Sequence, residues 1–184
     1  MKDQFNEIRK NLKEFEDKRE KTIQNSRDVI KLSKQIIYSV QREDFEEIKD
    51  LIKDIDEKVK LLEKTQKYDT EISSVAFQEY VEAIIFYGFI KDNKVPTYKQ
   101  LDVNVEDYLM GLCDLTGELS RRAVLLAIKN KIKDIEIIRD FIDDIHGEFL
   151  KLNLRNGELR KKSDSIKWNL KKVEEVLFSL KVKA

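Results

Sequence analysis

The chain has 184 residues, of which 39% are charged and 41% apolar, and its 36 basic and 36 acidic residues cancel to a formal charge of zero. This balance excludes a uniformly basic surface, so any contact with nucleic acid must come from local segregation of charge. A single cysteine, Cys113, excludes internal disulfides and cysteine metal clusters, and it suits a reducing cytoplasm. With only five glycines and one proline among many Lys, Glu, Leu and Ile residues, the composition predicts long helices.

Six helical segments are predicted in chain order. The first covers residues 5–38, the second follows the seam of Ile48, Ile55 and Leu62, and the others cover about 69–90, 105–128, 134–150 and the stretch from Gly157 to about 181. Residues 41–44 are either a tight turn or continuous helix, residues 91–97 with Pro96 are a break, and Asn104 is a predicted N-cap. We therefore expect one all-α domain over residues 1–184, built as an antiparallel bundle with short loops.

No secretory or membrane segment is expected. The N-terminus is polar and lacks the apolar core of a signal peptide. The most apolar stretch, residues 75–90, is interrupted by Gln78, Glu79 and Glu82, which favours a core helix over a membrane span.

Two of the most apolar helices each carry a pair of acids. Glu79 and Glu82 lie about one turn apart on one predicted helix, and Asp114 and Glu118 lie about one turn apart on another. Carboxylates on apolar helices need either a cation from solvent or a basic side chain as a partner. Facing each other, the two pairs would form a hard-oxygen site for Mg²⁺ or Mn²⁺, which supports phosphodiester hydrolysis.

A structural interpretation of the same acids stays open. Arg121 and Arg122 follow Glu118 by three and four residues, so an intrahelical salt bridge is possible there, and a lysine or arginine from another helix would neutralise Glu79. Other chemistry is poorly supported: one histidine and one cysteine do not build the usual zinc site, and no phosphate-binding glycine loop is present.

Two groups of basic residues are candidates for phosphate contacts, with a solvated helix face as the alternative. The first group lies on the first helix and the second near the start of the last helix: Arg19, Arg27, Lys31 and Lys34, then Arg155, Arg160, Lys161 and Lys162. Tyr68, Tyr98 and Trp168 are candidates for base stacking, although aromatic residues in a bundle more often belong to the core.

Four blocks of the sequence resemble the translin superfamily, which includes translin and translin-associated factor X. The blocks cover residues 19–34, residues 78–83, residues 106–121 and residues 152–176. The second block resembles factor X, whereas the last is closer to translin. The resemblance implies a helical subunit of about seven helices that assembles into a hollow octamer and binds single-stranded RNA or DNA.

In the factor X branch, the resemblance also implies metal-dependent endoribonuclease activity. The catalytic acids of that branch fall at Glu79, Glu82 and Asp114, with Glu118 nearby. Translin keeps an acid at the position of Glu118, so this residue is the least diagnostic. Our leading hypothesis is a homo-oligomeric, Mg²⁺- or Mn²⁺-dependent endoribonuclease; the alternatives are a non-catalytic nucleic-acid-binding oligomer with salt-bridged acids and a scaffold for a separate catalytic subunit.

Overall fold

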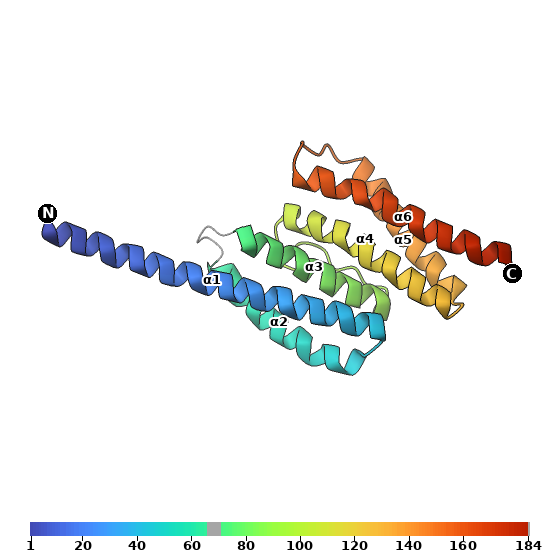
Figure 1. Ribbon diagram of the computed structural model, residues 1–184, viewed down its shortest axis with the longest axis horizontal. Coiled ribbons are helices and arrows are strands. Elements are labelled where there is room, and N and C mark those ends of the chain that lie inside the picture. Colours follow the sequence, from blue (N-terminus) through green and yellow to red (C-terminus); the bar gives the residue numbers. More distant parts are fainter. Residues whose placement is uncertain (66–70, 184) are drawn as a thin grey trace. The chain divides into compact units, whose positions relative to one another are not determined.

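The computed structural model describes residues 1–65 and 71–183, and these residues form helices without any strand. The helices are α1 (Lys2–Arg42), α2 (Phe45–Thr65), α3 (Glu71–Asp92), α4 (Val105–Ile128), α5 (Ile132–Leu150) and α6 (Glu158–Lys183) (Figure 1). The all-α prediction is confirmed, and six helices in the described ranges compare with the expected number of about seven. Tyr68 and the expected start of the third helix at Asp69 lie outside the described residues.

By their internal contacts, the residues fall into two compact units, Met1–Tyr80 and Val81–Ala184. In the first unit, α2 runs back along α1. The seam between them contains Val29, Ile36, Ile48, Ile55 and Leu62, and each of these side chains is completely buried. The prediction of an apolar seam on residues 48–62 is therefore confirmed, and its partner is the C-terminal half of α1.

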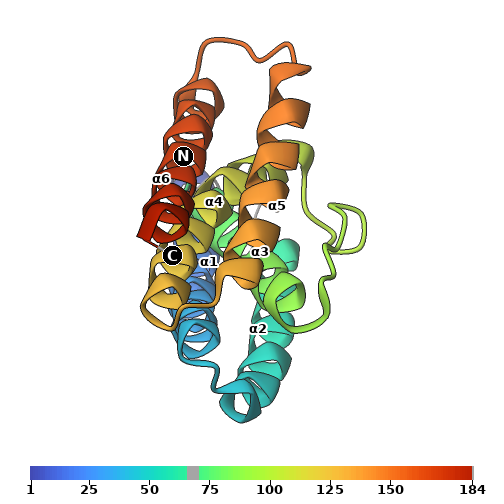
Figure 2. The same cartoon turned by 90° about the vertical axis from the view of Figure 1, so that its right-hand side faces the viewer.

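In the second unit, α4, α5 and α6 pack against one another. Figure 2 shows α5 and α6 side by side, joined by the segment of residues 151–157. Leu115, Leu119, Ile138, Ile142 and Ile166 form the core between the three helices and are at most 2% exposed. α4 therefore has protein on two sides, which matters for the carboxylate that it carries.

The predicted break at residues 91–97 is confirmed, since α3 ends at Asp92 and α4 begins at Val105, and of the two alternatives for residues 41–44 the turn is the one that forms. Glu43 adopts a left-handed conformation with φ of 64° and ends α1, so residues 41–44 contain a turn. The Asn104 side chain accepts a hydrogen bond from the Asp107 backbone N–H at 2.8 Å, as expected for an N-cap.

The end of α3 requires a glycine. Asn93 has φ of 54°, and the Lys94 backbone N–H donates to the Gly88 carbonyl oxygen at 3.0 Å. This bond closes the helix end around the left-handed Asn93. A Cβ at Gly88 would lie 2.7 Å from the Lys94 carbonyl oxygen, so a larger residue at position 88 would displace the turn.

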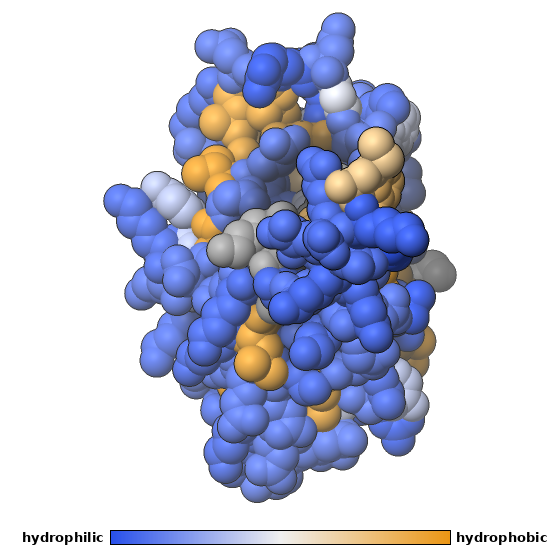
Figure 3. Space-filling model, turned by 90° about the vertical axis from the view of Figure 1, so that its left-hand side faces the viewer, coloured by the Kyte–Doolittle hydropathy of each residue, from blue (hydrophilic) through white to orange (hydrophobic). Residues whose placement is uncertain are grey.

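The surface matches the high charge content of the sequence. In the view of Figure 3 it is mostly hydrophilic, with a few separate apolar patches. None of the helices in the described part of the chain is long and apolar enough to cross a membrane, as the polar interruptions in residues 75–90 led us to expect.

Candidate functional site

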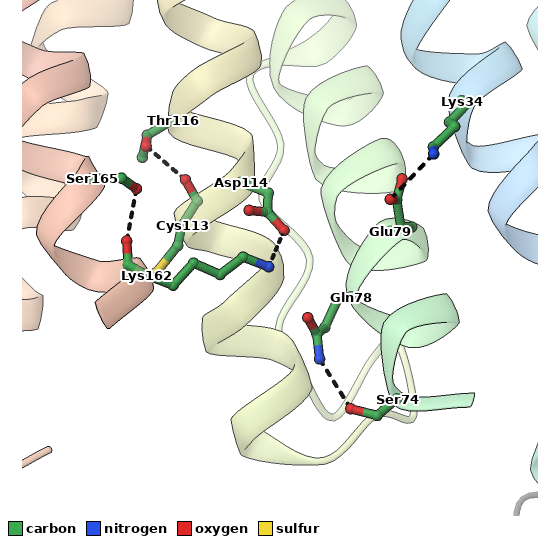
Figure 4. Close-up of polar contacts among 9 residues, drawn as sticks. All are labelled: Lys34, Ser74, Gln78, Glu79, Cys113, Asp114, Thr116, Lys162 and Ser165. Carbon is green, nitrogen blue, oxygen red and sulfur yellow. Dashed lines mark hydrogen bonds and ion pairs between the residues drawn. The ribbon is translucent and has the colours of Figure 1, made fainter. Parts of the chain in front are cut away.

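The acids of α3 have different environments. The Glu79 side chain is 23% exposed, and its Oε1 lies 3.8 Å from the Lys34 Nζ on α1 (Figure 4). Glu82, one turn further along α3, is only 7% exposed. A carboxylate as deeply buried as Glu82 is uncommon in proteins and requires compensating polar contacts.

The acids of α4 both have cationic partners. The Lys162 Nζ on α6 donates a hydrogen bond to the Asp114 carboxylate (Figure 4). Burial raises the pKa of Asp114, and the Lys162 ammonium opposes that rise. Glu118 lies 3.5 Å from the Arg121 guanidinium, so the expected intrahelical salt bridge forms.

These contacts bear on the predicted metal site. Carboxylate oxygens are the ligands that Mg²⁺ and Mn²⁺ prefer, and Glu79 and Asp114 each have a lysine ammonium group as their neighbouring cation. Within residues 1–65 and 71–183, however, no three His, Cys, Asp or Glu side chains form a group that could hold a metal ion. The donor chemistry fits such an ion, but the described geometry does not form its site, and the metal site stays a prediction.

A basic groove lies along α1. Arg27, Lys31, Lys34 and Tyr38 follow one another by four, three and four residues, which places them on one face of the helix. All four side chains are exposed, and they line an open groove of about 670 Å³. Three of the four cations predicted on the first helix are therefore brought together, whereas Arg19 lies outside the groove and 3.9 Å from Glu16.

Tyr38 was not predicted as a site residue. Its side chain is 55% exposed, its hydroxyl accepts a hydrogen bond from Arg42 at 2.9 Å, and the Arg42 guanidinium lies 5.3 Å from the ring centre. These contacts hold an aromatic ring at the end of the basic row. The sequence contains the signal, because Tyr38 follows Lys34 by four residues, one helical turn.

The second predicted basic group is divided among different environments. Lys161 donates to Glu158 at 2.7 Å, which raises the pKa of Lys161, and Lys162 is bound to Asp114. Arg155 and Arg160 are exposed, Arg155 before the start of α6 and Arg160 in its first turn. The structure therefore does not give this group the single row seen on α1.

The remaining candidates are the aromatic residues Tyr98 and Trp168, predicted for base stacking, and Cys113. Tyr98 packs edge-on against Tyr108 with ring centres 6.2 Å apart. Trp168 is 60% exposed, with Lys167 over its ring at 4.9 Å. Burial raises the pKa of the Cys113 thiol to about 12, so this cysteine is protonated and unreactive at neutral pH.

Comparison with known proteins gives a consistent result. The model of the Translin family matches residues 17–184. An uncharacterized protein of Methanocaldococcus jannaschii is 36% identical over 137 residues, which cover 72% of this chain and 61% of that protein. Human translin is 39% identical over 85 residues, which cover 46% of this chain and 37% of translin. The chain thus spans less than two thirds of the length of these relatives.

Similarity over nearly the full length is found with more distant proteins. The translin-associated protein X homolog of Schizosaccharomyces pombe is 26% identical, with 97% of this chain and 87% of that protein covered. The crystal structure of apo-NeC3PO has a TM-score of 0.90 and 26% identity, with 96% of both chains covered. The structure of an AfC3PO–duplex RNA complex has a TM-score of 0.88 at 24% identity, covering 98% of this chain and 97% of that one, and shows a shared fold.

Proposed function

This chain belongs to the Translin family, and from that membership together with the groove on α1 we propose that it binds single-stranded RNA as a homo-oligomer. The observation that carries the proposal is the row of Arg27, Lys31 and Lys34, which ends at the exposed ring of Tyr38. The AfC3PO neighbour was solved with duplex RNA and supports RNA as the class of ligand, whereas the preference for a single strand rests on the exposed ring of Tyr38. We extend the proposal to single-stranded DNA, to an octameric assembly and to a cytoplasmic location.

The chemistry of the groove favours a single strand. Cations spaced along one helix face follow a phosphate backbone, and their binding releases counterions and is therefore weakened by salt. An exposed aromatic ring stacks on a base only when that base is not already stacked within a duplex. Tyr38 therefore provides the selectivity, and the three cations provide most of the affinity.

The binding proposal is tested with fluorescence anisotropy of a labelled single-stranded RNA. The triple variant Arg27→Gln, Lys31→Gln, Lys34→Gln is expected to bind at least tenfold more weakly. Its slope of log affinity against log salt should fall by about 2, at ~0.7 per phosphate contact. The matched control removes three exposed lysines of α2, Lys49, Lys53 and Lys60, and should bind like the wild type. Equal affinity of the groove variant and this control would exclude the groove.

As a second function, we propose divalent-metal-dependent hydrolysis of the bound RNA by Glu79, Glu82 and Asp114, with Glu118 as a further ligand or supporting acid. The deep burial of Glu82 and the similarity to the protein X homolog support it. A bound Mg²⁺ or Mn²⁺ would supply an activated water and stabilise charge on the phosphate. The protein residues would hold that ion and orient the strand.

The ion pairs also favour the non-catalytic alternative, in which Lys34, Lys162 and Arg121 are the permanent partners of the acids. Incubation of the protein with labelled RNA in Mg²⁺, in Mn²⁺ and in a chelator distinguishes metal-dependent hydrolysis from binding without catalysis. Hydrolysis requires metal-dependent cleavage that Glu82→Gln and Asp114→Asn abolish while RNA affinity is retained. The exposed acids Asp164 and Glu174 provide the controls Asp164→Asn and Glu174→Gln, which should cleave normally. Metal-independent or absent cleavage by the wild type would leave only the binding function.

A further inference from the structure

The N-terminal half of α1 presents an apolar stripe to solvent. Phe5, Ile8, Leu12 and Phe15 are 52%, 42%, 61% and 42% exposed. Their spacing of three, four and three residues is the a/d pattern of a coiled-coil seam, with Phe5 and Leu12 at a, and Ile8 and Phe15 at d. Apolar side chains that gather on one helix face in this way mark a surface that packs against another helix.

The stripe continues a seam that is buried further along the same helix. The same a/d register leads through Arg19 to six later positions, all of which are completely buried: Thr22, Ser26, Val29, Ser33, Ile36 and Val40. α2 packs along this part of α1 but has 21 residues against the 41 of α1. Contacts of Asp28 with Lys58 and of Ser39 with Glu47 place the end of α2 near Thr22, and α1 continues beyond it (Figure 1).

The side chains that flank the stripe have complementary charges across a contact between two antiparallel copies of this segment. In such a pair, with Phe5 opposite Phe15 and Ile8 opposite Leu12, e positions face e positions and g positions face g positions. The e residues are Arg9 and Glu16, which would form two opposite-charge pairs across the twofold axis. The g residues, Gln4 and Asn11, would form two neutral polar pairs. In a parallel pair, Arg9 would face Gln4 and Glu16 would face Asn11, without any opposite-charge pair.

Charge also argues against other occupants of the stripe. Residues 2–18 contain five basic and five acidic side chains, so the segment has no net charge. Nucleic acid and anionic membrane surfaces both attract segments with a marked positive charge. In addition, the match to the Translin family begins at residue 17, so the stripe lies in a part of the chain that the family model does not cover.

We propose that residues 4–16 of α1 form an antiparallel two-helix contact with the same segment of a second copy of this chain. Four apolar side chains per copy are fewer than a stable interface usually presents, so the contact adds to other contacts between subunits. Existing exposed contacts, Arg9 to Asn6 at 2.7 Å and Glu16 to Arg19 at 3.9 Å, are weak and rearrange readily. This inference specifies a surface for the proposed self-association and does not depend on RNA binding.

Sedimentation velocity of the full chain without RNA, over a range of protein concentrations, tests the stripe. Ile8→Lys with Leu12→Lys should reduce the size of the assembly or raise the concentration needed for association at least tenfold. Both side chains are exposed, and unchanged circular dichroism would show that the fold is retained. The control exchanges the charges of Lys10 and Glu14, an intrahelical pair away from the stripe, and should behave like the wild type. Unchanged association of the stripe variant would overturn the proposal and assign the stripe to a different partner.

Charge exchange at the e positions tests the antiparallel geometry. Arg9→Glu and Glu16→Arg should each weaken association, because each variant places like charges opposite one another. An equimolar mixture of the two should regain association, and so should the double variant, since both restore two opposite-charge pairs. Failure of both to recover would overturn antiparallel pairing. RNA affinity, measured separately by anisotropy, reports on the proposed function, so failure of one proposal is distinguishable from failure of the other.

Discussion

Each unit of the molecule contains a lysine–aspartate pair between two helices, and the two pairs behave in opposite ways. In the first unit, Lys58 donates to Asp28 at 2.7 Å; in the second, Lys162 donates to Asp114. The two carboxylate side chains are almost equally exposed, at 30% and 32%. Yet the hydrogen bond from Lys58 lowers the pKa of Asp28, whereas burial raises the pKa of Asp114 despite Lys162.

The difference comes from the protein that surrounds each pair. Asp28 lies on α1, which packs along α2, whereas Asp114 lies on α4, which packs against both α5 and α6. More protein around a carboxylate replaces more of the water that would stabilise its charge, and one ammonium group then compensates only in part. The comparison teaches that a similar contact contributes differently to stability according to the packing behind it. It also shows that, of the two aspartates, the charged form of Asp114 would be stabilised more by a stronger cation than that of Asp28.

The largest expected change in the free energy of unfolding comes from removing the lysine of each pair. Lys162→Met should lower the free energy of unfolding by about 2 kcal/mol, because it leaves a half-buried carboxylate without its cation. Lys58→Met should cost only about 0.5 kcal/mol, because water solvates Asp28. Urea denaturation at fixed protein concentration measures both. Lys161→Met, which removes the exposed partner of Glu158, is the control, and equal losses at Lys58 and Lys162 would contradict the comparison.

Removing the acid should have a smaller effect of opposite sign in the two pairs. Asp28→Asn should lower the free energy of unfolding by about 0.5–1 kcal/mol, because a favourable charge–charge hydrogen bond is lost. Asp114→Asn should leave it unchanged or raise it by up to about 0.5 kcal/mol, since the fold favours the neutral form of Asp114 and the amide oxygen still accepts from Lys162. Thermal denaturation in a chelator measures both changes; a clear loss at Asp114 would show that Lys162 outweighs burial.

The smallest effect is on pH dependence, and its sign also differs. The pKa of Asp114 is raised above 3.8, so the unfolded chain loses this proton first, and stability falls as pH rises from about 3.8 through the raised value. The pKa of Asp28 is lowered below 3.8, so its contribution is present above that pH and is lost as pH falls through the lowered value. Subtracting the stability curves of Asp114→Asn and Asp28→Asn from that of the wild type should give these two slopes. Slopes of the same sign would refute the assignment.

Much of the fold was predictable because it depends on local patterns. The apolar seam of α2, the break at Pro96 and the Asn104 N-cap follow from residues a few positions apart, and the structure has all three. The Glu118–Arg121 pair was predictable for the same reason. The all-α class and the resemblance to the Translin family likewise required no coordinates.

The partners of the other acids were not predictable, because the residues concerned are far apart in the chain. Lys34 and Lys162 were predicted only as phosphate contacts, 45 and 48 residues from Glu79 and Asp114, and the structure pairs both with acids. The groove also includes Tyr38, whose role depends on its exposure and on Arg42. Whether the acids of both units bind one metal ion stays a prediction.

The sequence by itself determined which stretches are helical, which faces of them are apolar and which residues carry charge, because a helix repeats within four residues. Only the tertiary structure decided which of those faces and charges have a partner. The a/d register of α1 runs from Phe5 to Val40, but its positions are completely buried only from Thr22 onward. Likewise, Asp28 and Asp114 are the same residue beside the same kind of cation, and the density of packing around each sets the direction of its pKa.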